Sequence, residues 1–406
     1  MSSIVFTNAM IFDGSGRAPF LGEILVSGNR IVTVAEGENL IAQANAEIIN
    51  CNGATLMPGL VESHAHLSWP SSVGRIFNGM MMPPEEHLLV TAHNARVTLE
   101  AGFTSAYSAG SLGTRFEIAL KKEIEGGWTA GPRLISSSLE QAPQNVLGVP
   151  PAEGNKHGRG VEAMRNYVQE MATLGIDSIK LLLSGDDAFS EGASQNLTYT
   201  EEEVASAASE AHKHGIWLSC HAQSAESIKI ALRHGFRILY HCSHADDEAM
   251  DLLEAKKSEV FVAPAVSLRY ARMYEAEAFG ITREVAEKMG VFAEVERMQK
   301  IIPEMHKRGV RVLPGGDYGF PYNPVGRNAR DLELFVKLFG FSPTEALVAA
   351  TKFGGQLMGL EVGMIRENWL ADLLLIDGDP TQDVSILQAA SRILKIMKDG
   401  VFQRRQ

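Results

Sequence analysis

The sequence predicts an α/β protein built on a (β/α)8 (TIM) barrel, with a small composite β-sandwich domain formed from both chain termini. Three observations support this fold class. From Leu56 onward, short apolar runs alternate with longer helical patterns, which is typical of parallel β/α units. Most of these runs follow a glycine that ends a helical pattern, because glycine accepts the left-handed conformation found there. Before Leu56 and after Gly355, short strands linked by turns replace that alternation.

Both ends of the chain carry the pattern of short strands joined by tight turns. Near the N-terminus the turns are Asp13-Gly14 and Gly28-Asn29, and near the C-terminus Asp399-Gly400 joins two runs as a hairpin. We therefore assign residues 1–55 plus 360–406 to the composite β-domain and residues 56–359 to the barrel. The strands expected in the β-domain are 4–12, 22–27, 30–35, 46–50, 371–376, 393–398 and 401–403.

Eight apolar runs supply the expected barrel strands. Capping boxes mark the starts of two intervening helices, at residues 200–203 (Thr-Glu-Glu-Glu) and 342–345 (Ser-Pro-Thr-Glu). Eight parallel units over about 300 residues fit a (β/α)8 barrel, and a doubly wound open sheet is the alternative that the same alternation allows. The expected barrel strands are 56–63, 103–108, 133–138, 178–183, 216–221, 237–242, 259–265 and 310–317.

The composition excludes several classes of protein. The 406 residues carry a formal net charge of -12 and no Lys/Arg-rich run, so nucleic acid and anionic membranes are not expected partners. The three cysteines form no CxxC pair, which favours a reducing compartment over a disulfide scaffold. The N-terminus resembles a strand rather than a signal peptide, and no apolar run approaches the ~20 residues that span a membrane. We expect a soluble, cytoplasmic homo-oligomer that acts on a small molecule.

The first candidate site is the His-x-His at the end of residues 57–66 (Met-Pro-Gly-Leu-Val-Glu-Ser-His-Ala-His). Side chains alternate across a strand, so His64 and His66 share one face while Ala65 points away. Two imidazoles on one face can bind a metal ion. A structural histidine pair, in the core or at the surface, is the alternative.

Further metal-compatible residues stand at the ends of other barrel strands, where function gathers in such a fold. Lys180 lies in the fourth strand, His221 and His241 end the fifth and sixth, and Asp317 ends the eighth. Each has a structural alternative: an ion pair for the lysine, core packing for the histidines and a helix cap for the aspartate. A buried lysine can also react with CO2 to give a carbamate that bridges two cations. Together with His64 and His66, these residues would form a binuclear site suited to Zn2+ or Mn2+.

The neighbours of the two later histidines are assigned to packing. Cys220 precedes His221, and Tyr240 and Cys242 flank His241. Strand alternation turns these neighbours to the opposite face, so we expect both cysteines to pack toward the helices and Tyr240 to face away from the metals.

The order His-x-His, Lys180, His221, His241, Asp317 resembles the metal ligand set of the amidohydrolase superfamily, and the resemblance covers essentially the whole chain. Several stretches are similar to the imidazolonepropionase-like and Xaa-Pro dipeptidase (prolidase)-like branch. These stretches are residues 175–180, 203–221, 231–241 and 342–351.

The resemblance implies a role for each ligand. His64, His66 and Asp317 would hold the more buried metal, and His221 and His241 the more exposed one. Carboxylated Lys180 and a hydroxide would bridge two divalent ions, with Zn2+ expected and Mn2+ as an option. The hydroxide would attack an amide carbonyl, and Asp317 would pass the proton to the leaving nitrogen.

The resemblance implies a substrate class but no single substrate. The expected reaction is cleavage of the C–N bond of an N-acyl amino acid, a Xaa-Pro-type dipeptide or an aryl amide. A cyclic-amide hydrolase or deaminase of the imidazolonepropionase kind, which lacks the bridging lysine, is the alternative. A relative that kept the fold and lost catalysis is a third reading, although degraded relatives usually lose metal ligands and all six are present here.

The regions that hold substrate in the superfamily differ here. Tyr107-Ser108 replaces the Arg-Asp that many relatives carry after strand two, and residues 136–151 contain no histidine. An arginine could clamp a substrate carboxylate, and Arg269 with Tyr270 is the preferred pair. We hypothesise that an apolar segment, residues 77–84, forms a wall for the acyl group. The remaining candidate substrate contacts are His244, Tyr318, Arg327 and Arg330.

Overall fold

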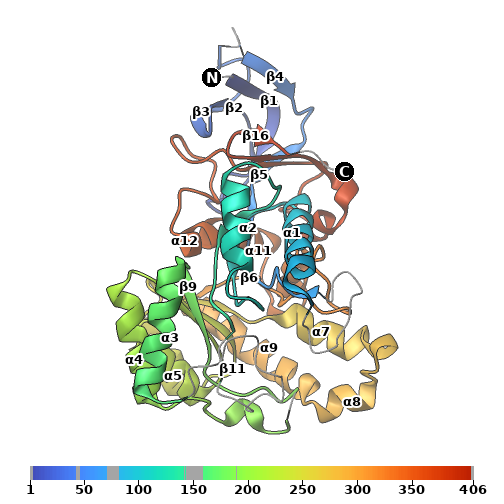
Figure 1. The fold of residues 1–406 in the computed structure, drawn as a ribbon. Helices are drawn as coiled ribbons and strands as arrows, with labels where there is room; N and C mark the ends of the chain where they lie inside the picture. Colours follow the sequence, from blue (N-terminus) through green and yellow to red (C-terminus); the bar gives the residue numbers. More distant parts are fainter. Residues whose placement is uncertain are drawn as a thin grey trace.

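The computed structural model describes residues 3–42, 46–70, 82–140, 142, 159–188 and 190–403. A sheet formed by strands from both chain ends lies at one end of the molecule, and both termini lie there (Figure 1). The α/β part, with its helices and parallel strands, occupies the rest (Figure 1). No helix within the described ranges is long and apolar enough to cross a membrane.

The sheet at the chain ends has eight strands in one connected ladder, in the order β16-β15-β14-β5-β1-β2-β3, with β4 paired to β1. Its core is made of buried aliphatic and aromatic side chains such as Phe6, Ile24, Leu56 and Leu373. The prediction that both ends of the chain contribute to one β-structure is therefore confirmed. The strands are β1 (Ser3–Ile11), β2 (Phe20–Ser27), β3 (Arg30–Glu36), β4 (Ala46–Asn50), β5 (Thr55–Pro58), β14 (Leu373–Ile376), β15 (Ile393–Lys398) and β16 (Val401–Phe402).

The first expected barrel strand is wrong in its extent, because residues 56–63 form parts of two strands. Strand β5 pairs with β1 and β14 in the terminal sheet, whereas β6 (Leu60–Ala65) pairs with β7 (Phe103–Ser108). Gly59 separates them at a point of close packing, where a Cβ would lie 2.1 Å from Oγ1 of Thr104. The predicted domain boundary at residue 55 therefore falls inside β5.

The remaining strands are parallel and follow one another in chain order. Strands β6, β7 and β8 form one sheet, and β9 to β13 form a second. The order lacks the reversal that defines a doubly wound sheet. Each of the other seven expected barrel strands overlaps one observed strand. These are β7, β8 (Arg133–Ile135), β9 (Ser178–Leu182), β10 (Trp217–Ser224), β11 (Ile238–His244), β12 (Phe261–Ala263) and β13 (Arg311–Val312).

Contacts at both junctions join the two parallel sheets. After β8, Ser137 bridges to Ser178 of β9, and the Ser138 amide donates to the Ser178 carbonyl oxygen at 2.9 Å. After β13, Oγ of Ser63 in β6 donates to the Pro314 carbonyl oxygen at 2.6 Å. The ends of β8 and β13 thus lie beside β9 and β6.

The parallel strands contribute to two separate apolar clusters. Val61, Tyr107, Tyr240 and Phe261, from strands β6, β7, β11 and β12, belong to one of them. A larger cluster lies between strands and helices and contains Cys220 and Cys242, as predicted.

The helices largely follow the strands in alternation, and both predicted capping boxes are formed, at Thr200 with Glu203 and at Ser342 with Glu345. The α-helices are α1 (Pro84–Glu100), α2 (Phe116–Glu125), α3 (Val161–Leu174), α4 (Glu201–Lys213), α5 (Ala225–Arg233), α6 (Asp247–Ala255), α7 (Val266–Tyr274), α8 (Arg283–Lys288), α9 (Val291–Lys307), α10 (Arg330–Phe339), α11 (Pro343–Val348) and α12 (Gly354–Met358).

Candidate metal centre

The six residues predicted as metal ligands are all buried, and they lie toward the carboxyl ends of the parallel strands. His64 belongs to β6 and His66 follows it, Lys180 belongs to β9, and Asp317 stands in the loop after β13. His221 and His241 lie in β10 and β11.

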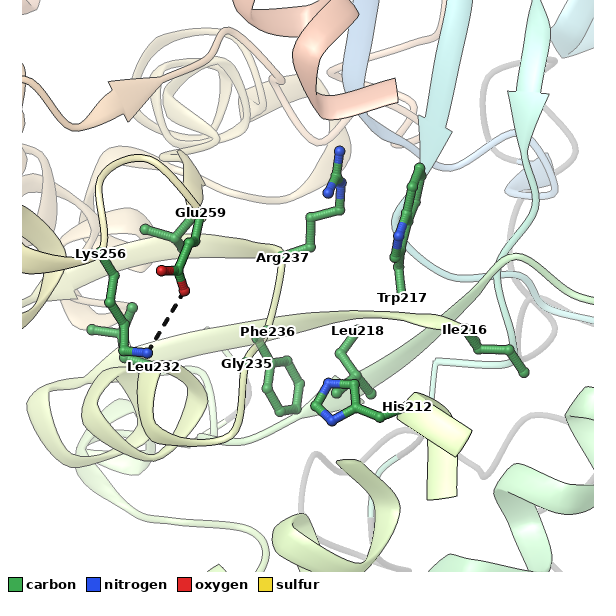
Figure 2. A pocket seen from close by; sticks show the side chains of 11 residues that line it. His212, Ile216, Trp217, Leu218, Leu232, Gly235, Phe236, Arg237, Lys256 and Glu259 are labelled. Carbon is green, nitrogen blue, oxygen red and sulfur yellow. Dashed lines mark ion pairs between the residues drawn. The ribbon is translucent and has the colours of Figure 1, made fainter. Parts of the chain in front are cut away.

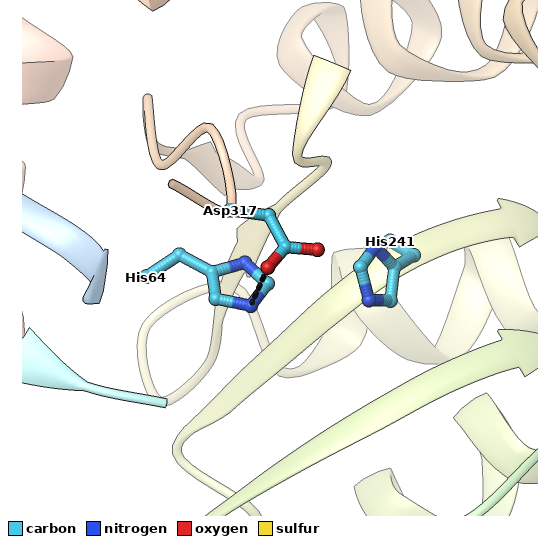
Figure 3. Close-up of side chains that lie close together, drawn as sticks. All are labelled: His64, His241 and Asp317. Carbon is cyan, nitrogen blue, oxygen red and sulfur yellow. Dashed lines mark ion pairs between the residues drawn. The ribbon is translucent and has the colours of Figure 1, made fainter. Parts of the chain in front are cut away.

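Three histidines, His64, His66 and His241, lie close to the carboxylate of Asp317. Its Oδ1 lies 3.1 Å from Nε2 of His66 and 3.8 Å from Nε2 of His64. The possible ligand atoms of His64, His241 and Asp317 all lie within 4.8 Å of one another (Figure 3). Nδ1 of His64 and Nδ1 of His241 are buried and have no hydrogen-bond partner among the described residues. Buried imidazoles beside a carboxylate, with unused ring nitrogens, fit a divalent metal ion.

Left-handed backbone conformations occur at two of the predicted ligands and at a residue next to one of them. His241, Cys242 and Asp317 have φ angles of 76°, 54° and 59°. Such conformations are costly for residues other than glycine, and they cluster at functional sites. In β6, the pairing with β7 shifts register between Glu62 and Ala65, just where His64 lies. The strand ends therefore depart from simple alternation at the metal centre.

Tyr240 is the clearest consequence, and the expectation that it faces away from the metals is wrong. Its ring stacks on His64 with centroids 3.9 Å apart and an interplanar angle of 29°. Nζ of Lys180 lies 4.4 Å from the same ring centroid. Because the positive φ of His241 breaks the alternation of β11, both Tyr240 and His241 reach the centre.

Lys180 and His221 lie beside these residues. The His221 ring is 4.3 Å from that of His241 between centroids, and its Nε2 lies 3.1 Å from the Gly185 carbonyl oxygen. Nζ of Lys180 donates to the Ala109 carbonyl oxygen at 2.8 Å and lies 3.3 Å from Oε1 of Glu140. The lysine is thus held by an ion pair, which is the structural alternative that the sequence left open.

Burial and charge set the protonation of the histidines and Asp317. Desolvation lowers the pKa of both His64 and His241 well below the ordinary value, so these rings are neutral and able to accept a metal. Burial would also lower the pKa of His66, but its bond to Asp317 and the nearby Glu140 raise the pKa overall. Burial alone would raise the pKa of Asp317, but the bond from His66 and the charge of Arg269 help to hold it far below the usual range.

Arg269 lies beside the centre. It is fully buried in α7, with Nη1 3.7 Å from Oδ2 of Asp317 and Nη2 3.2 Å from Oε1 of Glu294. Its Nη2 also lies 3.7 Å from Oδ2 of Asp186. The predicted carboxylate clamp is therefore close enough to the centre to meet a substrate, and it is surrounded by acids that neutralise it.

The other predicted substrate contacts are engaged by protein partners. Tyr270 packs under the Arg330 guanidinium, which lies 4.8 Å from its ring centroid. The Tyr318 hydroxyl donates to Oγ of Ser267 at 2.9 Å. Nε2 of His244 lies 3.1 Å from Nη2 of Arg297. The remaining candidates, Arg327 and Arg330, both pair with Glu275. Residues 77–81 of the predicted apolar wall lie outside the described residues.

Two acids near the centre, Glu62 and Asp331, were missed by the sequence reasoning. Oε1 of Glu62 accepts from the His64 amide at 2.9 Å, and Oε2 accepts from Nδ2 of Asn328 at 2.6 Å. Asp331 accepts from the amides of Ser267 at 3.0 Å and Gly315 at 2.8 Å. Only Glu62 carried a sequence signal, since it stands two residues before the His-x-His. These acids tie together the backbones that carry the ligands.

A cavity of about 130 Å³ lies at the opposite ends of strands β10, β11 and β12 (Figure 2). Trp217 and Arg237 line it, and Lys256 pairs with Glu259 at 3.9 Å on its other side. His221 and His241 lie further along β10 and β11 than the residues that line the cavity, so this cavity is separate from the candidate metal centre.

The profile of the amidohydrolase family matches residues 55–402. The chain belongs to the amidohydrolase family. It is therefore a hydrolase that acts on carbon–nitrogen bonds, in a family whose members typically depend on metal.

Two curated relatives match most of this amidohydrolase. Ochratoxinase of Aspergillus niger is 25% identical over 371 residues, which make up 85% of this chain and 75% of that protein. Imidazolonepropionase of Deinococcus deserti is 22% identical over 390 residues, which make up 90% of this chain and 88% of that protein.

Solved structures share the fold. A crystal structure of a Xaa-Pro dipeptidase with bound methionine in the active site aligns with a TM-score of 0.84 and 24% identity, and it covers 100% of both chains. The crystal structure of A. niger ochratoxinase aligns with a TM-score of 0.81 and 22% identity, and it covers 99% of this chain and 95% of that chain.

Proposed function

We propose that this protein is a binuclear metal-dependent amidase, in which the side chains of His64, His66, Lys180, His221, His241 and Asp317 hold two divalent ions. Zinc is the expected metal, manganese is the alternative, and a carbamate on Lys180 is the expected bridge. Bound metal ions supply an acidified water and a polarised carbonyl.

The convergence of six buried polar side chains from five strand ends carries this proposal. Burying so many polar groups without water is costly unless they are paired or bind metal. Nδ1 of His64 and Nδ1 of His241 lack partners among the described residues. Buried imidazoles with unused ring nitrogens beside the Asp317 carboxylate are the ligand types that a divalent ion would use.

The chain's own residues would orient the substrate and move the proton. Asp317 would accept a proton at its carboxylate and return it to the leaving nitrogen, while His66 and Arg269 hold that carboxylate in place. Arg269 would also attract a substrate carboxylate. Tyr240, stacked on His64, would fix the orientation of the imidazole and exclude water beneath it.

The expected substrates are N-acyl amino acids, Xaa-Pro-type dipeptides and aryl amides. Two relatives named for such reactions, ochratoxinase and the Xaa-Pro dipeptidase, support the choice of a small-molecule amide. A screen of these compounds with zinc-loaded protein tests the proposal. Absence of turnover on every acyclic amide in the screen would contradict it.

Metal content tests the binuclear centre separately. Protein produced with ample zinc should bind two zinc ions per chain, as measured by inductively coupled plasma spectrometry. Lys180→Arg keeps the positive charge but cannot form the carbamate, so its zinc content should fall to about one ion per chain. Equal zinc content in Lys180→Arg and the wild type would exclude a bridging lysine.

A cyclic-amide hydrolase or deaminase with one metal is the second candidate. The ion pair between Lys180 and Glu140 favours it, because a lysine that stays cationic does not bridge metals. The similarity to imidazolonepropionase adds to this candidate. Turnover of cyclic amides with one zinc per chain, and none of acyclic amides, would decide in its favour.

The architecture around the centre is also part of the proposal. We infer that β6 to β13 close into a (β/α)8 barrel and that the sheet made from both chain ends belongs to a β-sandwich domain that includes β5. The contacts of Ser137 with Ser178 and of Ser63 with Pro314 support closure at both junctions.

A further inference from the structure

A row of four aromatic rings runs outward from the metal centre. The Trp69 ring lies 4.9 Å from that of His66 between centroids, and Phe320 lies 4.9 Å from Trp69. Tyr322 follows at 5.5 Å from Phe320 with an interplanar angle of 19°, and Phe279 lies 5.9 Å from Tyr322. These spacings are those of interacting aromatic pairs.

The row changes from buried to exposed along its length. Trp69, next to the centre, is 8% exposed, whereas Phe279 at the far end is 47% exposed. Phe320 and Tyr322 between them are half-buried. None of the four rings belongs to a hydrophobic core cluster of the described residues. The row therefore extends from the surface toward the centre and lies outside the hydrophobic core clusters of the described residues.

Three separate loops build the row at the carboxyl ends of the strands. Trp69 follows β6, Phe320 and Tyr322 follow β13, and Phe279 lies in the 3-10 helix η3 (Glu277–Phe279) after α7. Loops in this position set substrate preference in barrel enzymes.

The rings are held in place by specific contacts. Arg272 lies in α7, 5% exposed; its Nε donates to the Tyr322 hydroxyl at 3.4 Å, and its guanidinium lies 5.7 Å from the Phe320 centroid. A Cβ on Gly319 would lie 2.8 Å from Cβ of Trp69, so glycine lets the loop after β13 approach that ring. Nε1 of Trp69 is buried and has no hydrogen-bond partner within the described ranges. The row thus offers fixed apolar faces and one unused donor close to the centre.

We propose that Trp69, Phe320, Tyr322 and Phe279 form the wall that binds an aromatic group of the substrate, which makes this enzyme selective for amides with an aryl-bearing acyl or amine part. This inference rests on the proposed amidase function. A flat ring stacked along the row would extend the series of aromatic contacts and replace water on Phe320 and Tyr322. Small aliphatic amides would leave the faces of the Phe320 and Tyr322 rings exposed to water and would therefore bind less tightly.

Two matched substrate pairs test the wall. N-benzoyl-alanine against N-acetyl-alanine varies the acyl part, and N-acetyl-phenylalanine against N-acetyl-alanine varies the amine part. We expect the wild type to prefer the aryl member of at least one pair in kcat/KM. Phe320→Ala should reduce that preference about tenfold, mainly through KM. Tyr322→Leu is the second variant, because it keeps apolar volume while removing the ring, together with the hydroxyl that accepts from Arg272.

The control is Trp128→Ala, because Trp128 is 76% exposed and stands just beyond α2, outside the aromatic row. It should leave both preferences unchanged. Wild-type preferences that persist in Phe320→Ala and Tyr322→Leu, or the absence of any aryl preference in the wild type, would overturn the wall.

Calorimetry with phenylacetate separates this inference from the proposed function, since phenylacetate has no amide bond. Phenylacetate should bind the wild type and bind Phe320→Ala about tenfold more weakly, whether or not any amide is hydrolysed. Phenylacetate binding without amide turnover would refute the proposed amidase function and would still support the aromatic wall. Turnover of amides with equal phenylacetate affinity in both proteins would refute the wall alone.

Discussion

Replacing Gly315 by alanine should disturb the metal centre through packing. Gly315 lies between the end of β13 and β6, and a Cβ there would lie 2.4 Å from Oγ of Ser63 and 2.9 Å from Cβ of His64. It would also lie 3.1 Å from the His64 amide nitrogen. These are contacts that real Cβ atoms avoid, so β6 must move. Overpacking of this kind costs about 1–3 kcal/mol of the free energy of unfolding.

A double-mutant cycle measures whether the close contact is the cause. Ser63→Ala removes the nearest atom and also the bond from Oγ to the Pro314 carbonyl oxygen, which costs about 0.5–1.5 kcal/mol on its own. Urea unfolding of Gly315→Ala, Ser63→Ala and the double variant should give a favourable coupling energy of about 0.5–2 kcal/mol. The rescue should be partial, because the contact with His64 remains.

Zinc binding is the second readout of the same cycle. Gly315→Ala should bind zinc more weakly than the wild type, since His64 moves, and the double variant should recover part of that affinity. Unfolding free energy and zinc affinity within error of the wild type in Gly315→Ala would show that β13 and β6 do not pack as described.

Three further predictions concern the centre and its surroundings. Asp317→Asn should fold and lose about 10²–10⁴-fold in kcat, because it removes a proton acceptor; wild-type turnover in this variant would contradict the proton-transfer role. Chelation should abolish hydrolysis and lower the melting temperature, and added zinc at about 1,000 times its Kd should restore about 4 kcal/mol of stability; a melting temperature insensitive to zinc would argue against a resident metal. Burial and the charge of Arg297 lower the pKa of His244 to about 4. Between about pH 6.5 and pH 4, His244 therefore binds a proton in the unfolded chain but not in the folded chain. The free energy of unfolding should fall as the pH drops through this range. His244→Gln should show a smaller fall in unfolding free energy between pH 7 and pH 5, and equal falls in the two proteins would exclude this origin.

Regular periodicity explains what the sequence predicted well. The order of the parallel strands follows from apolar runs alternating with helical patterns, and the two-residue period places His64 and His66 together while Ala65 joins a separate core cluster. The same period predicts that Cys220 and Cys242 pack toward the helices, as they do. These features depend only on local backbone geometry.

The misplaced features depend on local irregularities or on distant partners. Nothing in the sequence around His241 signals its φ of 76°, so Tyr240 was placed on the wrong face. The separation of β5 from β6 had a signal in Pro58-Gly59, a common turn dipeptide, which the continuous apolar run obscured. The ion pair of Lys180 with Glu140 joins residues of different loops and strands, and no spacing rule predicts it.

The sheet made from both chain ends has a consequence for the order of synthesis. Oγ1 of Thr55 in β5 donates to the carbonyl oxygen of Gly378, 323 residues further along the chain, at 2.6 Å. Strand β5 also pairs with β14 along its whole length. On the ribosome, the early strands must therefore wait, with one edge unpaired, until almost the entire polypeptide has been made. Contacts between such distant residues form slowly, so completion of this sheet is expected to be a late step in the maturation of the enzyme.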